Sequence, residues 1–151
     1  MDTEHVYFME MAIKAAETAG TINEVPVGAV VVNISGQVIA TAYNETIARC
    51  DPSAHAEMLA LRRAARNIQN YRLLGTTLYA TVEPCVMCMG AAVHARVSRV
   101  VFGAPDPKWG ACGSIYDFSQ NSRLNHRPDI LAGVCMERCR DLMRDFFVRK
   151  R

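Results

Sequence analysis

Apolar residues along this chain follow two different patterns, which divide it into helices and strands. Over residues 6–19 they return every three or four positions, which predicts an amphipathic helix. Residues 27–32 and 37–42 are instead rich in valine, isoleucine and alanine, and the turn-forming pair Ser35-Gly36 separates them. The first third of the chain therefore predicts a helix followed by a β-hairpin.

The same criteria extend the prediction to the rest of the chain. Asp51-Pro52-Ser53 supplies helix-start residues with Ser53 as the expected cap, and Pro84 suits the first position of another helix. Residues 104–113 are predicted to form a loop. Further helices are expected at 54–66, 84–95 and 134–148, with strands at 76–82, 99–102 and 129–131. Strands that alternate with helices predict an α/β layered fold.

Composition limits the architecture more than the function. With 151 residues, half of them hydrophobic, the chain can bury one core, so we expect a single domain over residues 1–151. A formal charge of +2 does not by itself indicate a nucleic-acid partner. Residues 1–19 resemble neither a signal nor a transit peptide and no apolar run is long enough for a membrane, so a cytoplasmic location is expected. The six cysteines are then expected to be reduced, bound to metal or simply buried.

Two short motifs carry the chemistry. His55-Ala56-Glu57 is followed, after an intervening helix and strand, by Pro84-Cys85-Val86-Met87-Cys88, a combination typical of zinc-dependent nucleobase deaminases. Two cysteines three positions apart at a helix start lie on one side of a turn, where the helix dipole favours thiolates. His55, Cys85 and Cys88 would leave one tetrahedral position of Zn²⁺ open for water, as in catalytic rather than structural sites.

Glu57 is the expected proton carrier. Zinc brings the pKa of bound water to about 7, and Glu57 would transfer the proton from the water to the base during hydroxide attack. Residues at i and i+2 do not share a helical face, so His55 and Glu57 are predicted to flank a cavity at the tip of a helix.

Each part of this motif also has an alternative explanation. Cys85 and Cys88 alone are compatible with a redox pair or with two buried thiols, and His55 and Glu57 alone with ordinary structural residues. No ligand pattern surrounds the other four cysteines; Cys135 and Cys139, at helical spacing, are expected to pack as small apolar side chains. His94 and His126 remain structural or substrate-side candidates.

Beyond these motifs, the sequence resembles the bacterial-type tRNA-specific adenosine deaminases of the cytidine deaminase superfamily over nearly its whole length. The similarity is carried by residues 24–29, 51–57, 70–73, 83–88, 100–104, 113–114, 125–127 and 145–147. The zinc motif alone is shared with cytidine, cytosine and guanine deaminases, so the later segments indicate the substrate.

The resemblance implies a three-layer cytidine-deaminase-like fold, with a mixed five-stranded sheet between helices. It implies hydrolytic deamination of the wobble adenosine of a tRNA anticodon to inosine, by attack of zinc-bound hydroxide on C6. One Zn²⁺ per subunit, a homodimer and an anticodon stem-loop with its adenosine flipped into the pocket are also implied. A free-base deaminase acting on guanine or cytosine is the main alternative, and a non-catalytic zinc module that binds RNA is a more distant one.

The resemblance also indicates RNA-binding residues. Asn44 matches the base-contacting asparagine of the family, although a strand-end turn would also favour asparagine. Asp106 and Lys108 match a loop beside the target nucleotide. Asn125 and Arg127 are expected either to contact RNA or to brace a turn. At the basic end of the chain, Arg149, Lys150 and Arg151 are expected to bind RNA phosphates. Phe146 and Phe147 are expected either to stack on bases or to pack in the core. Departures from the family pattern at Tyr43, Pro105, Trp109 and Cys112 leave the flanking-base preference open.

Overall fold

The computed structural model describes residues 2–150 and contains four helices and five strands in that range. The helices are α1 (Thr3–Thr21), α2 (Ala56–Ile68), α3 (Val86–His94) and α4 (Met136–Lys150). The strands are β1 (Gly28–Val32), β2 (Val38–Tyr43), β3 (Thr77–Val82), β4 (Arg99–Ala104) and β5 (Asp129–Ala132). Every helix and strand expected from the sequence is present, with ends shifted by a few residues.

The strands form one mixed sheet in the order β2-β1-β3-β4-β5. β1 is antiparallel to both β2 and β3, whereas β3, β4 and β5 run parallel to one another. The carboxyl ends of β2, β3, β4 and β5 therefore meet at one edge of the sheet, because β1, between β2 and β3, runs in the opposite direction. We call this edge the carboxyl edge; ligand sites of open α/β sheets commonly lie at such an edge.

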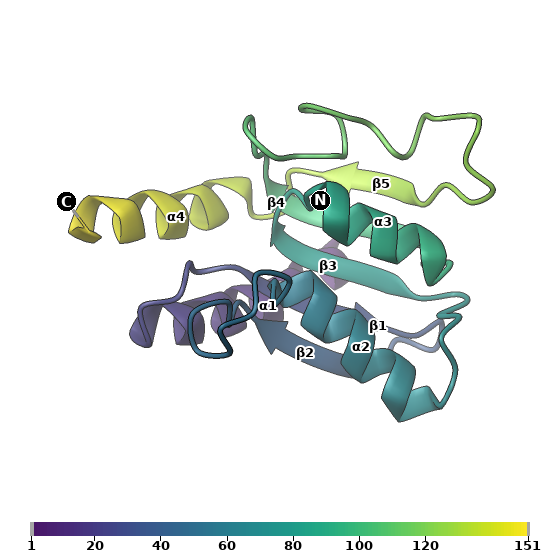
Figure 1. The fold of residues 1–151 in the computed structure, drawn as a ribbon, viewed down its shortest axis with the longest axis horizontal. Helices are drawn as coiled ribbons and strands as arrows, with labels where there is room; N and C mark the ends of the chain where they lie inside the picture. The colour runs from purple at the N-terminus through teal and green to yellow at the C-terminus, as the bar shows by residue number, and fades with distance from the viewer. Residues whose placement is uncertain (1, 151) are drawn as a thin grey trace.

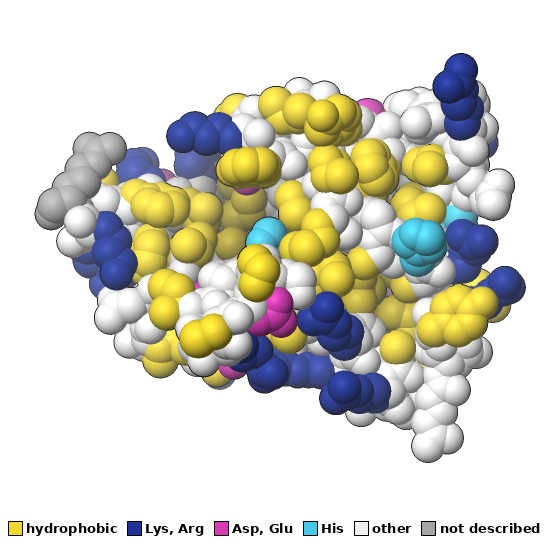
Figure 2. Space-filling model, viewed as in Figure 1, with side chains coloured by type: hydrophobic (Ala, Val, Ile, Leu, Met, Phe, Trp, Pro, Cys, Tyr) yellow, Lys and Arg dark blue, Asp and Glu magenta, His cyan; other side chains and the backbone are white. Residues whose placement is uncertain are grey.

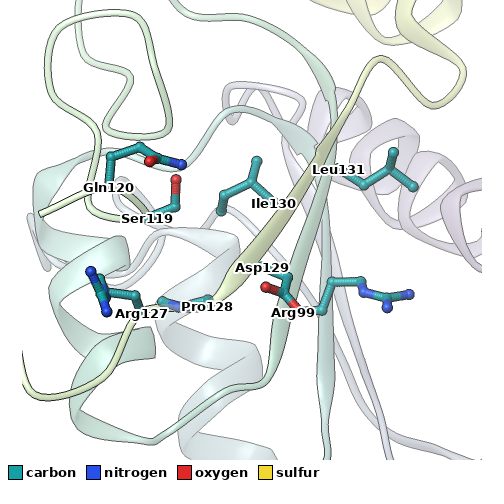
Figure 3. A pocket seen from close by; sticks show the side chains of 8 residues that line it. All are labelled: Arg99, Ser119, Gln120, Arg127, Pro128, Asp129, Ile130 and Leu131. Carbon is teal, nitrogen blue, oxygen red and sulfur yellow. The ribbon is translucent and has the colours of Figure 1, made fainter. Parts of the chain in front are cut away.

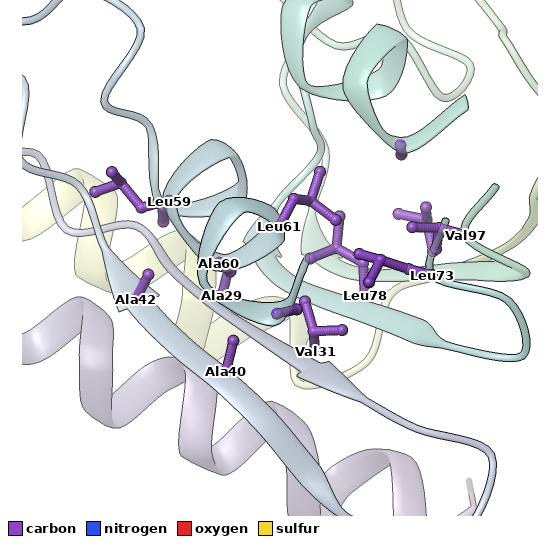
Figure 4. Close-up of a cluster of buried hydrophobic side chains, with 14 of the residues drawn as sticks. Ala29, Val31, Ala40, Ala42, Leu59, Ala60, Leu61, Leu73, Leu78 and Val97 are labelled. Carbon is purple, nitrogen blue, oxygen red and sulfur yellow. The ribbon is translucent and has the colours of Figure 1, made fainter. Parts of the chain in front are cut away.

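Two apolar clusters cover the two faces of the sheet and make three layers (Figure 1). One cluster joins α2 and α3 to the sheet through residues such as Leu59, Leu78 and Met89, and Figure 4 shows part of it. The other joins α1 and α4 to the opposite face through Phe8 and Cys139. The predicted α/β fold with a five-stranded sheet between helices is confirmed. Within residues 2–150 no helix is both long and apolar enough to span a bilayer.

One expected helix start is wrong in a way that matters for the site. Ser53 does not cap α2; its hydroxyl donates to Asp51 Oδ1 at 2.7 Å, and the N-cap position belongs to His55. Helix α3 likewise begins after Cys85, not at Pro84. The two predicted metal-binding motifs therefore begin on extended backbone immediately before a helix.

Candidate metal centre

Two helix N-termini deliver the predicted ligands to the carboxyl edge of the sheet. His55 is the N-cap of α2 and Cys85 the N-cap of α3, both with extended backbone and neither making a side-chain cap hydrogen bond. Cys88 lies in the first turn of α3 and is fully buried. Because the positive ends of two helix dipoles meet here, anionic ligands are favoured.

The three ligand atoms are spaced like the corners of a zinc tetrahedron. Cys85 Sγ and Cys88 Sγ lie 3.7 Å apart, and His55 Nδ1 lies 3.6 Å from Cys85 Sγ and 3.5 Å from Cys88 Sγ. Zinc–sulfur bonds of about 2.3 Å and zinc–nitrogen bonds of about 2.0–2.1 Å at tetrahedral angles separate the two sulfurs by about 3.8 Å and sulfur from nitrogen by about 3.6 Å. The residues therefore fit Zn²⁺ bound through Nδ1 and two thiolates.

A fourth protein ligand is not part of this cluster. Within residues 2–150, the only group of three or more histidine, cysteine or acidic side chains placed to hold a metal consists of His55, Cys85 and Cys88. Three protein ligands with one position left for water are typical of catalytic zinc.

The two thiols are coupled to each other and to the histidine. The interaction with Cys88 and then that with His55 lower the pKa of Cys85 to about 4, whereas the interaction with Cys85 and burial raise the pKa of Cys88 well above its usual value. The low pKa of Cys85 thus has its cause in Cys88 and His55, and acidification of both thiols by the helix terminus stays a prediction. A divalent cation between them would favour both thiolates.

Glu57 lies beside this cluster with its carboxyl group buried. Its side chain is 4% exposed, and burial raises its pKa to about 7, against a smaller opposing effect of His55. Since His55 stands outside the helix and Glu57 inside its first turn, the i, i+2 spacing does not place them on opposite helical faces. The predicted arrangement at a helix tip agrees with this geometry, and a carboxyl group of this pKa can both accept and return a proton near neutral pH.

Asn44 reaches the same edge through the turn that follows β2. The side chain is buried, and its amide nitrogen donates to Glu24 Oε1 at 3.5 Å and Thr46 Oγ1 at 3.4 Å. Glu24 also accepts from the backbone N–H groups of Ile47 and Ala48, at 3.2 and 2.7 Å. A buried carboxylate therefore holds the whole turn and orients the asparagine.

Asp106 and Lys108 lie in the loop after β4, also at the carboxyl edge. Asp106 Oδ1 accepts from the backbone N–H groups of Lys108 and Trp109 at 3.1 and 3.3 Å, so this carboxylate shapes the loop. The backbone N–H of Asp106 donates to Glu83 Oε1 at 3.0 Å. The sequence alone predicts no role for Glu83 or Glu24. The only feature that could have indicated one is the position of each acidic residue close to an apolar strand.

The remaining predicted residues are more dispersed. Asn125 precedes the amino-terminal end of β5, and its neighbour His126 bonds through Nε2 to the carbonyl of Val97 at 2.6 Å, which places this turn at the edge opposite the metal ligands. The structure thus does not bring Asn125 to the metal site within one chain. His126 has a structural role, and His94 ends α3 at that far edge.

The carboxyl-terminal residues lie on the metal side. Helix α4 extends past the carboxyl ends of β4 and β5 (Figure 1), and Arg149 and Lys150 are exposed in its last turn. Phe146 is buried and Phe147 is 48% exposed, so only Phe147 is free to stack on a base. Lys150 Nζ lies 5.5 Å from the centre of the Phe146 ring, and Arg151 is outside the described residues.

A large open cavity lies away from this centre. It has a volume of about 750 Å³ and is lined at the start of β4 and β5 by Arg99, Arg127 and Asp129, among others. In Figure 3, Arg99 and Arg127 extend in opposite directions, so their charges do not converge on one ligand. The cavity is therefore not the substrate site that the metal ligands imply.

Comparison with known proteins agrees with the geometry. Residues 2–104 match the family model of the cytidine and deoxycytidylate deaminase zinc-binding region. The chain is 46% identical over 143 residues to the tRNA-specific adenosine deaminase of Haemophilus influenzae, covering 95% of this chain and 83% of that protein. It is 44% identical over 145 residues to the tRNA-specific adenosine deaminase of Bacillus subtilis, covering 96% and 89%.

Solved structures give the same picture. A chain from a study of A-to-I editing by tRNA:A34 deaminases at the wobble position superposes with a TM-score of 0.87 and 40% identity, covering 90% of this chain and 98% of that one. Guanine deaminase from Nitrosomonas europaea superposes with a TM-score of 0.80 at 23% identity, covering 95% and 84%. This second likeness concerns the fold alone.

The ligand set makes a prediction about metal content. The purified protein is expected to hold about one zinc per chain by mass spectrometry, and Cys85→Ala or Cys88→Ala to hold less than about a tenth of that, because two ligands do not retain zinc at catalytic affinity. Cys112→Ala and Cys139→Ala serve as matched controls and keep their zinc. Loss of zinc in Cys112→Ala would instead show a fourth thiolate and a structural site.

Proposed function

Because this chain belongs to the cytidine and deoxycytidylate deaminase zinc-binding family, we propose that it deaminates the wobble adenosine of a tRNA anticodon loop to inosine. The zinc-dependent deaminase chemistry rests on one observation, the zinc-spaced trio His55, Cys85 and Cys88 with buried Glu57 beside it. The choice of adenosine in tRNA is supported by relatives of 46% and 44% identity that are tRNA-specific adenosine deaminases.

The reaction consumes one water and releases ammonia. When bound by His55, Cys85 and Cys88, zinc supplies a water that is acidic enough to be a nucleophile at neutral pH. Glu57 takes a proton from the attacking water and delivers it to ring N1 as the oxygen bonds to C6. The same carboxyl group then carries the second proton to the exocyclic nitrogen, the C6–N bond breaks, and ammonia leaves.

Several side chains around the metal fit an RNA substrate. Asn44 is oriented before substrate binds, since Glu24 and Thr46 hold its amide nitrogen, and it is proposed to contact the base. Lys108 and Trp109 are exposed on the adjacent loop and are proposed to meet neighbouring nucleotides. An anticodon loop is already single-stranded, so extruding one base costs less than opening a duplex pair.

We also propose that two chains pair through α3. This helix contains no Lys, Arg, Asp or Glu, and besides its buried side it carries exposed Val86 and half-buried Met87. A helix that is apolar on all sides is typically covered. Figure 2 shows hydrophobic side chains gathered over the middle of the face that carries α2 and α3, with basic residues around it. A second copy of the same apolar face is the simplest cover.

The activity is tested by supplying an anticodon stem-loop, free guanine and free cytosine separately and measuring inosine and ammonia. The stem-loop is expected to react, and Glu57→Gln to lose at least about 100-fold in kcat while keeping its zinc, because it cannot carry the proton. Exposed Glu17→Gln on α1 is the matched control and keeps full activity. Reaction of a free base alone would support the guanine or cytosine deaminase alternative and refute the tRNA proposal.

The role of the basic end of α4 is tested by the salt dependence of RNA binding. Replacing Arg149 and Lys150 by alanine removes two phosphate-binding cations and is expected to reduce the slope of log affinity against log salt by about 1.4, at about 0.7 per phosphate for single strands. The matched control replaces exposed Lys14 and Arg66, which lie on α1 and near the far end of α2. An unchanged slope in the α4 variant rejects its role in RNA binding.

Pairing through α3 is tested with Gly90→Glu. A Cβ at Gly90 meets no atom within 4 Å, so the variant is expected to fold and keep zinc. Its charge would lie inside the apolar contact, and light scattering should show a mass near 16.7 kDa instead of twice that value. Thr18→Glu, on α1 across the sheet, is the control and stays dimeric. A wild-type monomer at micromolar concentration would rule the proposal out.

A further inference from the structure

Glu83 is a buried acidic residue with no part in the metal cluster or in the proton transfer. It lies between β3 and the ligand Cys85, and its side chain is 4% exposed. Both carboxylate oxygens point into the loop that follows β4. Oε1 accepts from the Asp106 N–H at 3.0 Å and the Ser114 hydroxyl at 2.5 Å, and Oε2 from the N–H groups of Cys112 and Ser114 at 2.9 and 3.1 Å.

The same loop is joined to the metal-binding turn by its backbone. The N–H of Ala111 donates to the carbonyl of Pro84 at 2.9 Å, and Gly110 forms an isolated antiparallel bridge with the zinc ligand Cys85. Gly110 is needed for this approach, since a Cβ there would overlap the Glu83 carboxylate. The loop and the metal ligand therefore share one small hydrogen-bonded unit.

Apolar packing contributes little to holding this loop. Ala111 is fully buried, but Trp109 is 69% exposed and Lys108 is also exposed. Trp109 is the single tryptophan of the chain. The Asp106 side chain shapes the turn at Lys108 and Trp109. With so little side-chain burial, the four hydrogen bonds to Glu83 are what anchor this turn to the rest of the protein, at Asp106, Cys112 and Ser114.

We propose that Glu83 is a positioning residue that fixes residues 105–114 against the Pro84-Cys85 turn, so that Lys108 and Trp109 meet the nucleotide beside the reacting base at a set distance from the metal. This role rests on the proposed RNA substrate, whereas the fixing of the loop does not. Glutamine cannot replace the carboxylate: each oxygen accepts two bonds, so either orientation of the amide turns its NH₂ group toward two donors.

The test makes two measurements on Glu83→Gln. The fluorescence anisotropy of Trp109 without RNA reports the mobility of the loop, and kinetics on the anticodon stem-loop report its effect on the reaction. Glu83→Gln is expected to lower the anisotropy and to raise KM at least about tenfold while kcat changes less than about threefold. Zinc stays at one per chain. Ser114→Ala, which loses the hydroxyl bond and retains the other three, should give an intermediate KM, and Glu17→Gln should match the wild type.

Gly110→Ala disturbs the same contact from the loop side, because its Cβ would overlap the Glu83 carboxylate, and it leaves Glu83 intact. This variant remains informative if Glu83→Gln does not fold. It should give the same loss of anisotropy and the same rise in KM, and the double variant should be no worse than either single one. Wild-type anisotropy and KM in both variants would overturn the proposal, as would a fall in kcat at unchanged KM, or loss of zinc. If the wild type fails to act on RNA, the anisotropy still decides whether Glu83 fixes the loop.

Discussion

The site depends on the spacing of three ligand atoms from two distant parts of the chain. They lie 3.5–3.7 Å from one another, as the ligands of a tetrahedral Zn²⁺ do. His55 and Cys85 each occupy the extended position before a helix, and the first turn of α3 brings Cys88 to within 3.7 Å of Cys85. The sheet makes this possible, since α2 and α3 pack on the same face and begin at the same edge. Glu57 then needs only to follow His55 by two residues to lie beside the metal.

Two buried carboxylates extend this order to the substrate side. Glu24 holds the turn that carries Asn44, and Glu83 holds the loop that carries Asp106 and Lys108. Each accepts several N–H groups, as a buried charge requires if its desolvation is to be offset. The site is thus a metal centre flanked by two loops. Hydrogen bonds keep these loops in place, and apolar contacts contribute little.

The sequence predicted the helices and strands and the metal ligands for different reasons. Periodicity revealed the helices because each has one face in a core, and apolar runs revealed the strands because the central ones are buried on both faces. The ligand motifs are local in sequence. The cap at His55 was not predictable from composition, because Ser53 is a better cap in isolation and its hydroxyl bonds to Asp51 instead. The roles of Glu24 and Glu83 depend on N–H groups 20 or more residues away, and the far-edge position of Asn125 depends on strand order. None of these follows from local pattern.

The most direct measurement on the central claim is X-ray absorption spectroscopy of the zinc-loaded protein. Two sulfurs at about 2.3 Å, one imidazole nitrogen at about 2.0–2.1 Å and one further light atom are expected, because His55, Cys85 and Cys88 leave a position for water. A shell of three or four sulfurs, or no sulfur pair at all, would contradict an open catalytic zinc at this edge of the sheet.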